Sequence, residues 1–262
     1  MDLDTIDYER RDGVGHVRFN RPEGANAVNP AFSRDLREVM LEIEHDDDVK
    51  AVSVTAEGKV FCAGGDLKEF AAAGPGLPRL AADMLVDFHG AIYKMNRMPK
   101  PVVAGVGGAA GGAGLSIVSA FDLVVAGESA KFTMAYTRAG VTPDGTSSYF
   151  LARHIGLRRM LDLTLTNRVL SADEAERWGL VNRVVPDADV DSATADLAQQ
   201  LADGPAWATG HAKRVIYAGF DSPLEQAAEY EAEVITTAMA THDGQEGISA
   251  FAEKRSPDFQ GR

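Results

Sequence analysis

The chain has 262 residues, 45% hydrophobic and 25% charged, which is typical of a globular protein with one sizeable core. Its 39 acidic residues exceed its 26 basic ones, and the formal net charge of −13 argues against the basic face that nucleic-acid binding requires. The only cysteine, Cys62, excludes an intramolecular disulfide, and the charged residues 1–13 do not resemble a signal peptide. We therefore expect a cytoplasmic protein.

Short apolar strands alternate with helices through residues 14–185. The alternation in Val14–Phe19 predicts a strand, and Asn29 before Pro30 predicts the N-cap of a helix that runs to about His45. Further strands are predicted over residues 51–55, 102–106, 123–126 and 181–185, and helices over residues 80–95, 114–120 and 148–165. This alternation predicts parallel βαβ units.

After Pro186 the pattern becomes helical. Helices are predicted over residues 192–201, 207–218 and 223–240, and Ser222 is predicted to cap the last of them, with Glu225 at its third position. The segment Gly74–Pro78 predicts a mobile loop.

Residues 101–121 carry no charge and are long enough to span a bilayer. Six of them are glycine and five are alanine, however, so few large apolar side chains would face lipid, and Asp122 follows at once. We predict a buried strand, a glycine-rich turn and a tightly packed helix here, and no membrane segment.

Two segments of small residues, 61–69 and 105–114, stand at strand-to-helix junctions. Glycine lets a ligand approach the main chain, and a helix N-terminus presents unpaired N–H groups that can hold an oxyanion. Two other readings remain open. The spacing Gly105-x-Gly107-x-x-Ala110 superficially fits a dinucleotide fingerprint, although it lies at mid-chain, and the glycines could serve helix packing alone.

Motifs along nearly the whole chain resemble, in order, those of the crotonase (enoyl-CoA hydratase/isomerase) superfamily. They are Asn20–Pro22, Asn26–Ala27, Phe61–Glu69, Lys100–Gly114, Phe121–Leu123, Ala130–Phe132, Leu170–Ala175, Trp178–Val181, Glu246–Phe251 and Lys254–Arg255. The resemblance implies an α/β fold, a crotonase-like spiral of ββα units with a C-terminal α-helical trimerisation region. It assigns residues 1–200 to the spiral core with the CoA and oxyanion site and residues 201–262 to the helical region, in a homotrimer or a dimer of trimers.

The resemblance also implies the binding site for an acyl-CoA substrate. The backbone N–H groups of Gly65 and Ala113 would form the oxyanion hole. Contacts to CoA and substrate are expected from Ala63, Gly64, Asp66, Leu67, Lys68, Gly112, Tyr136, Phe251 and Lys254. Lys68 or Lys254 would contact the phosphate groups of CoA; alternatively, both are solvated surface lysines. Coenzyme A enters as part of the substrate, so no separate cofactor is expected, and the histidine spacing suggests no metal site.

The chain departs from the hydratase pattern at both positions where hydratases of this superfamily carry a glutamate. These positions fall on Ser116 and Tyr136, which are poor bases near neutral pH, so ordinary hydration is not expected. Asp144 resembles the acid of dienoyl-CoA isomerases, 1,2-epoxyphenylacetyl-CoA isomerases and 4-chlorobenzoyl-CoA dehalogenases, although Asp-Gly is also a turn dipeptide. His89 stands at the position of the histidine that activates water in dehalogenases, although it could also be an ordinary helix residue. Gly65 departs from the dehalogenase pattern, which has an aromatic residue at that position.

Three hypotheses follow. The first is isomerisation of an unsaturated acyl-CoA, in which Asp144 moves a proton between two carbons of a stabilised enolate. The second is dehalogenase- or hydrolase-like chemistry on an aryl-CoA, with Asp144 as nucleophile and His89 as base. The third is a non-catalytic acyl-CoA-binding trimer.

Overall fold

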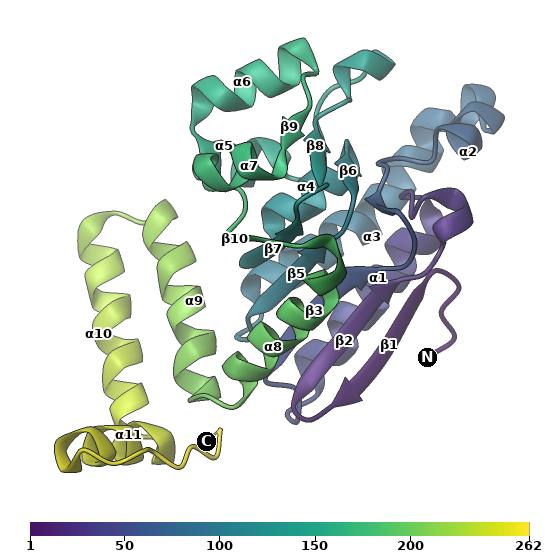
Figure 1. Cartoon of the computed structure of the whole chain (residues 1–262). Helices are drawn as coiled ribbons and strands as arrows, with labels where there is room; N and C mark the ends of the chain where they lie inside the picture. Colours follow the sequence, from purple (N-terminus) through teal and green to yellow (C-terminus); the bar gives the residue numbers. More distant parts are fainter. Residues whose placement is uncertain (262) are drawn as a thin grey trace.

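Two sheets built from alternating strands organise the chain in the computed structural model, which describes residues 1–261 (Figure 1). The larger sheet has the order β1-β2-β3-β5-β7-β10 and the smaller has the order β4-β6-β8-β9. The strands are β1 (Ile6–Arg11), β2 (Val14–Phe19), β3 (Ala51–Ala56), β4 (Val60–Cys62), β5 (Val102–Val106), β6 (Ala109–Gly111), β7 (Leu123–Gly127), β8 (Lys131–Thr133), β9 (Leu170–Ser171) and β10 (Arg183–Val185). All neighbours pair in parallel except β1 with β2 and β8 with β9.

Four of the helices within residues 1–261 come after a pair of strands, which gives the expected ββα units. The helices are α1 (Pro30–His45), α2 (Leu67–Ala72), α3 (Leu77–Arg97), α4 (Ala113–Ala120), α5 (Ser147–Ile155), α6 (Leu157–Thr166), α7 (Ala172–Trp178), α8 (Val190–Ala202), α9 (Ala206–Asp221), α10 (Leu224–Ala240) and α11 (His242–Glu253). In the pairs β3–β4, β5–β6 and β7–β8 the first strand joins the large sheet and the second, only three residues long, joins the small one, whereas β1 and β2 both belong to the large sheet. The fold class is therefore the predicted α/β spiral with C-terminal helices.

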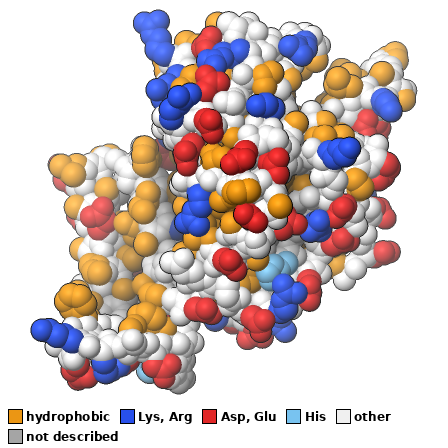
Figure 2. All heavy atoms as spheres, in the orientation of Figure 1, with side chains coloured by type: hydrophobic (Ala, Val, Ile, Leu, Met, Phe, Trp, Pro, Cys, Tyr) orange, Lys and Arg blue, Asp and Glu red, His pale blue; other side chains and the backbone are white. Residues whose placement is uncertain are grey.

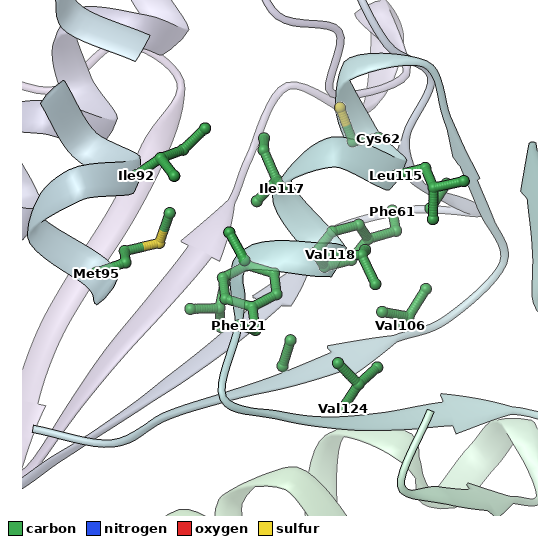
Figure 3. Close-up of a cluster of buried hydrophobic side chains, with 14 of the residues drawn as sticks. Phe61, Cys62, Ile92, Met95, Val106, Leu115, Ile117, Val118, Phe121 and Val124 are labelled. Carbon is green, nitrogen blue, oxygen red and sulfur yellow. The ribbon is translucent and has the colours of Figure 1, made fainter. Parts of the chain in front are cut away.

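The strand over Val14–Phe19 and the helix from Pro30 to His45 have the predicted bounds. Asn29 caps α1, because its side chain accepts a hydrogen bond of 2.9 Å from the N–H of Phe32. The stretch 101–121 forms β5, β6 and α4, all eight residues of α4 are buried, and no helix within residues 1–261 is long and apolar enough to cross a membrane. Figure 3 shows this helix packed at the centre of the core, with side chains such as Leu115 and Val118 against Val106 of β5.

Three local predictions were wrong. Residues 148–165 form two helices, because Gly156 adopts a φ of +82° between them. Ser222 ends α9 and makes no side-chain cap to α10, which begins at Leu224. The segment Gly74–Pro78 is a 3-10 turn over Gly74–Gly76 followed directly by α3. The predicted boundary between the spiral core and the C-terminal region, after residue 200, falls in the last turn of α8, and α8 packs on the large sheet. This division into two regions remains a prediction.

The α9–α10 hairpin extends away from the two sheets, with α11 across its end (Figure 1). α10 has no buried residue, and Figure 2 shows hydrophobic side chains gathered on the hairpin. The large exposed hydrophobic residues of α9–α11 are Ile216, Phe220, Leu224, Ile235, Met239, Ile248 and Phe251. Two open pockets of about 820 and 520 Å³ lie where α9 meets the core.

Candidate active site

Two main-chain N–H groups are left free where the glycine-rich segments meet. The N–H of Val28 donates to Gly64 O at 2.7 Å and that of Asp66 donates to Val28 O at 2.9 Å, which uses the groups on either side of Gly65. Ala113 is the first residue of α4, so its N–H has no intrahelical acceptor. Within residues 1–261, neither the N–H of Gly65 nor that of Ala113 donates to a protein acceptor.

The glycines allow these two segments to approach closely. A Cβ on Gly64, whose φ is +105°, would lie 2.9 Å from Gly111 O and 3.5 Å from Ala113 N. A Cβ on Gly114 would collide with the main chain of Cys62. Packing alone therefore requires some of the glycines, and the same packing brings the Ala113 amide beside the segment that carries the Gly65 amide.

The start of α2 is held by an ion pair. The carboxylate of Asp66 accepts from the N–H groups of Lys68 and Glu69, each at 3.2 Å, and lies 2.6 Å from Nη2 of Arg21. The Arg21 guanidinium holds the pKa of Asp66 below its usual value. The side chain of Asp66 thus fixes the loop that carries Gly65, while Leu67 and Lys68 are exposed at the helix start.

Ala63 and Gly112, also predicted to contact the substrate, belong to the same two glycine-rich segments. Ala63 donates its N–H to Ala25 O at 3.0 Å, and Gly112, with a φ of +50°, precedes the first turn of α4. Phe70 was not predicted: a Cβ on Gly65 would lie 2.6 Å from its ring. The ring of Phe70 therefore occupies the space that a side chain at position 65 would fill.

His89 and Asp144 lie in contact, although 55 residues separate them in the sequence. Nε2 of His89, on α3, is 2.9 Å from Oδ1 of Asp144, in the turn before α5. Their side chains are 29% and 35% exposed, so both remain accessible. The ring of Tyr93, one helical turn along α3, lies 6.2 Å from the imidazole. An acid and a potential base thus lie in hydrogen-bond contact at a partly exposed position.

Hydroxyl groups stand at positions 116 and 136, which the resemblance equates with the glutamates of hydratases. Oγ of Ser116 lies 2.9 Å from the hydroxyl of Tyr136, and both hydroxyls donate to the main-chain oxygen of Asp144, at 2.7 and 3.2 Å. Burial raises the pKa of Tyr136, so its hydroxyl is neutral. Ser116 lies one helical turn after Ala113 on α4 and binds the main chain of Asp144. Asp144 is therefore held about one helical turn along α4 from the free N–H of Ala113.

Comparison with known proteins assigns the family. Residues 9–262 match the family model described as enoyl-CoA hydratase/isomerase. The chain belongs to the enoyl-CoA hydratase/isomerase family. Within this family it is 37% identical over 254 residues to 4-chlorobenzoyl coenzyme A dehalogenase-2 of Arthrobacter sp, covering 95% of this chain and 91% of that one. It is 34% identical over 252 residues to 1,2-epoxyphenylacetyl-CoA isomerase of Escherichia coli strain K12, covering 95% and 96%.

The fold agrees with solved structures of the family. The crystal structure of an enoyl-CoA hydratase from Polaromonas sp. JS666 superposes with a TM-score of 0.93 at 32% identity, covering 97% of this chain and 99% of that one. Relatives of similar identity therefore carry the names of a hydratase, an isomerase and a dehalogenase. Family membership shows action on acyl-CoA but does not select one of these reactions.

Two predicted substrate contacts lie far from the rest of the site in this family member. Phe251, 88% exposed, lies in α11 and Lys254 at its end, whereas Gly65 precedes α2 and Ala113 begins α4; Figure 1 shows α11 at the end of the α9–α10 hairpin, away from α2 and α4. One chain does not bring them together, because the hairpin extends away from the sheets. Within residues 1–261, no group of three or more His, Cys, Asp or Glu side chains has the arrangement of a metal site.

Proposed function

We propose that the chain isomerises an unsaturated acyl-CoA thioester, with Asp144 as the residue that moves the proton. The supporting observation is that the neutral hydroxyls of Ser116 and Tyr136 bind the main chain of Asp144, whose carboxylate lies 2.9 Å from His89 and is an acid suited to proton transfer. The free N–H groups of Gly65 and Ala113 are suited to the thioester oxygen, where negative charge develops as the enolate forms.

In this reaction the carboxylate of Asp144 removes a proton from a carbon next to the thioester or conjugated with it. The electron pair moves onto the thioester oxygen, and the protonated acid then returns the proton to a different carbon. Substrate and product have the same mass, and no water is consumed. One carboxylate is sufficient because both carbons belong to one bound substrate.

The test is a panel of 2-enoyl-, 3-enoyl-, dienoyl- and aryl-CoA esters, with products analysed by mass spectrometry. We expect a product of unchanged mass and a changed absorption spectrum. Asp144→Asn should lose about 10²–10⁴-fold in turnover, as expected for removal of a general base, while CoA-ester binding is retained. Asp83→Asn, an exposed aspartate of α3 that pairs with Arg79 at 2.7 Å, is the control. A mass gain of water, or full activity of Asp144→Asn, would contradict the proposal.

A second candidate is displacement on an aryl-CoA, favoured by the 2.9 Å contact between His89 and Asp144. The carboxylate of Asp144 would add to a ring carbon and expel a leaving group with its bonding electrons. Water deprotonated by His89 would then hydrolyse the aryl ester and regenerate the acid. Isolation of an adduct on Asp144 and loss of turnover in His89→Gln would replace the first proposal by this one. Tight binding of every ester without turnover would indicate a non-catalytic acyl-CoA binder.

We also propose that the chain assembles as a homotrimer or a dimer of trimers through its C-terminal helices. The support is the exposed apolar surface of α9–α11 and the two open pockets where α9 meets the core. In such an assembly Phe251 and Lys254 would serve a neighbouring chain's substrate. Sedimentation velocity of the wild type and of Ile235→Asp checks this, with a smaller species expected for the variant.

A further inference from the structure

Hydrogen-bond donors converge on the main-chain oxygen of Asp144. It accepts from Oγ of Ser116 at 2.7 Å, Oγ of Ser147 at 3.0 Å, the hydroxyl of Tyr136 at 3.2 Å and the N–H of Ser147 at 3.4 Å. A carbonyl oxygen has two lone pairs, so one or two donors normally satisfy it. Donors from three segments of the chain therefore surround this one peptide oxygen, more than it can accept from at once.

The backbone that follows Asp144 is strained and enclosed. Gly145 and Thr146 have φ values of +62° and +61°, and the left-handed conformation is unfavourable for a β-branched residue such as threonine. A Cβ on Gly145 would lie 2.8 Å from both the ring of Phe88 and Cβ of Ser116. The turn is therefore pressed between α3 and α4, and its conformation depends on these contacts.

We propose that Ser116, Tyr136 and Ser147 are positioning residues that fix the Asp144 main chain and thereby direct its carboxyl group towards His89. This rests on the proposed function in that Asp144 is taken as the reacting acid. The three hydroxyls need not touch the substrate, because they act on the peptide group whose Cα carries the carboxylate. A shift of about 1 Å in such a group is enough to lower a rate about 10²-fold.

The same geometry disfavours a glutamate at position 116 or 136 of this chain. A carboxylate at either position would direct acceptor oxygens at the Asp144 carbonyl, which is itself an acceptor. The Ser116 side chain is also fully buried against Gly145, so a longer side chain would displace the turn. The hydroxyls and Asp144 thus form one hydrogen-bonded unit.

The test uses Ser116→Ala and Tyr136→Phe, each of which removes one donor and little volume. Ser119→Ala is the matched control, because Ser119 is a buried serine of the same helix that donates to a main-chain oxygen, that of Ser116, at 2.7 Å. Two quantities are measured: the kcat and KM for exchange of the substrate α-proton in D₂O, and the ¹⁵N chemical shifts of the His89 ring in the absence of substrate. The ring signals are assigned by their loss in His89→Gln.

We expect kcat to fall about 10–100-fold in Ser116→Ala and Tyr136→Phe with little change in KM, and to stay at the wild-type value in Ser119→Ala. In an Asp144→Asn background the two substitutions should have no further effect on exchange. The His89 ring shifts should move towards their Asp144→Asn values in both variants and not in the control.

Unchanged ring shifts in both variants would overturn the positioning role, and so would a fall in kcat that is equally large without Asp144. The ring shifts separate this inference from the proposed function, because they report the His89–Asp144 contact whether or not the wild type exchanges protons. A wild type without exchange but with the expected ring shifts would refute the proposed function and leave the positioning role supported.

Discussion

Substitution of Gly64 by alanine should damage both stability and catalysis, because this residue sets how closely the two glycine segments approach. An alanine at a φ of +105° carries backbone strain of about 1–3 kcal/mol. Its Cβ would lie 2.9 Å from Gly111 O, and overpacking of this kind adds about 1–3 kcal/mol. The free energy of unfolding should therefore fall by roughly 2–6 kcal/mol.

The main chains of residues 64 and 111 can relieve this contact by moving apart, which also separates the N–H groups of Gly65 and Ala113. Removal of one oxyanion donor lowers kcat by about 10²–10³-fold, and the displacement should approach that loss. Urea unfolding and α-proton exchange measure the two effects. Gly74→Ala is the control, since its φ is +52° and its Cβ would meet nothing within 4 Å, so only about 1–2 kcal/mol of strain is expected there, without loss of kcat. Equal stability of the two variants, with wild-type kcat in Gly64→Ala, would refute the reasoning.

Two further substitutions test the charges that hold the chain together. Lys213→Met should lower the free energy of unfolding by roughly 3–5 kcal/mol, because Asp122, 2.7 Å from the lysine Nζ, is left as an unpaired buried charge. The double variant Lys213→Met/Asp122→Asn should recover part of this loss, as measured by urea titration. Arg255 lowers the pKa of Glu246 to about 2, so this pair stabilises the fold above the unfolded-state value near 4.5 and ceases to do so as the pH falls through about 2. Glu246→Gln should therefore unfold at lower urea than the wild type at pH 7, with a difference that shrinks between pH 4.5 and 2.

Elements with a strong local signal were predicted well. The alternation in Val14–Phe19 and the Asn29–Pro30 cap each depend on a few neighbouring residues, and both bounds agree with the structure. The three-residue strands β4, β6 and β8 were missed because their extended conformation comes from pairing with one another, which no local pattern records. The strand β1 was missed because its sequence IDYERR is mostly charged and its exposed face hides the alternation.

The site was only partly predictable for a similar reason. Gly65, Ala113 and Asp144 followed from the resemblance, but the contact between His89 and Asp144 depends on how α3 packs beside the turn before α5, and 55 residues separate the two side chains. Ser147 was missed altogether, although it is the first residue of α5, two positions after the Asp-Gly dipeptide, and serine is a common partner for turn main chain. Phe70 was missed because only the structure shows that its ring fills the space beside Gly65.

The two candidate reactions place opposite demands on His89, which makes this residue decisive. In isomerisation Asp144 must accept a proton and return it, and an imidazole 2.9 Å away can only orient the carboxylate or compete for that proton. Replacement by glutamine, which keeps a hydrogen-bond donor, should then preserve much of the rate. In displacement Asp144 loses its charge when it becomes an ester, so the imidazole is released to deprotonate water, and glutamine cannot do this. A His89→Gln enzyme that forms an adduct and does not hydrolyse it would therefore assign displacement, whereas near-normal proton exchange would assign isomerisation.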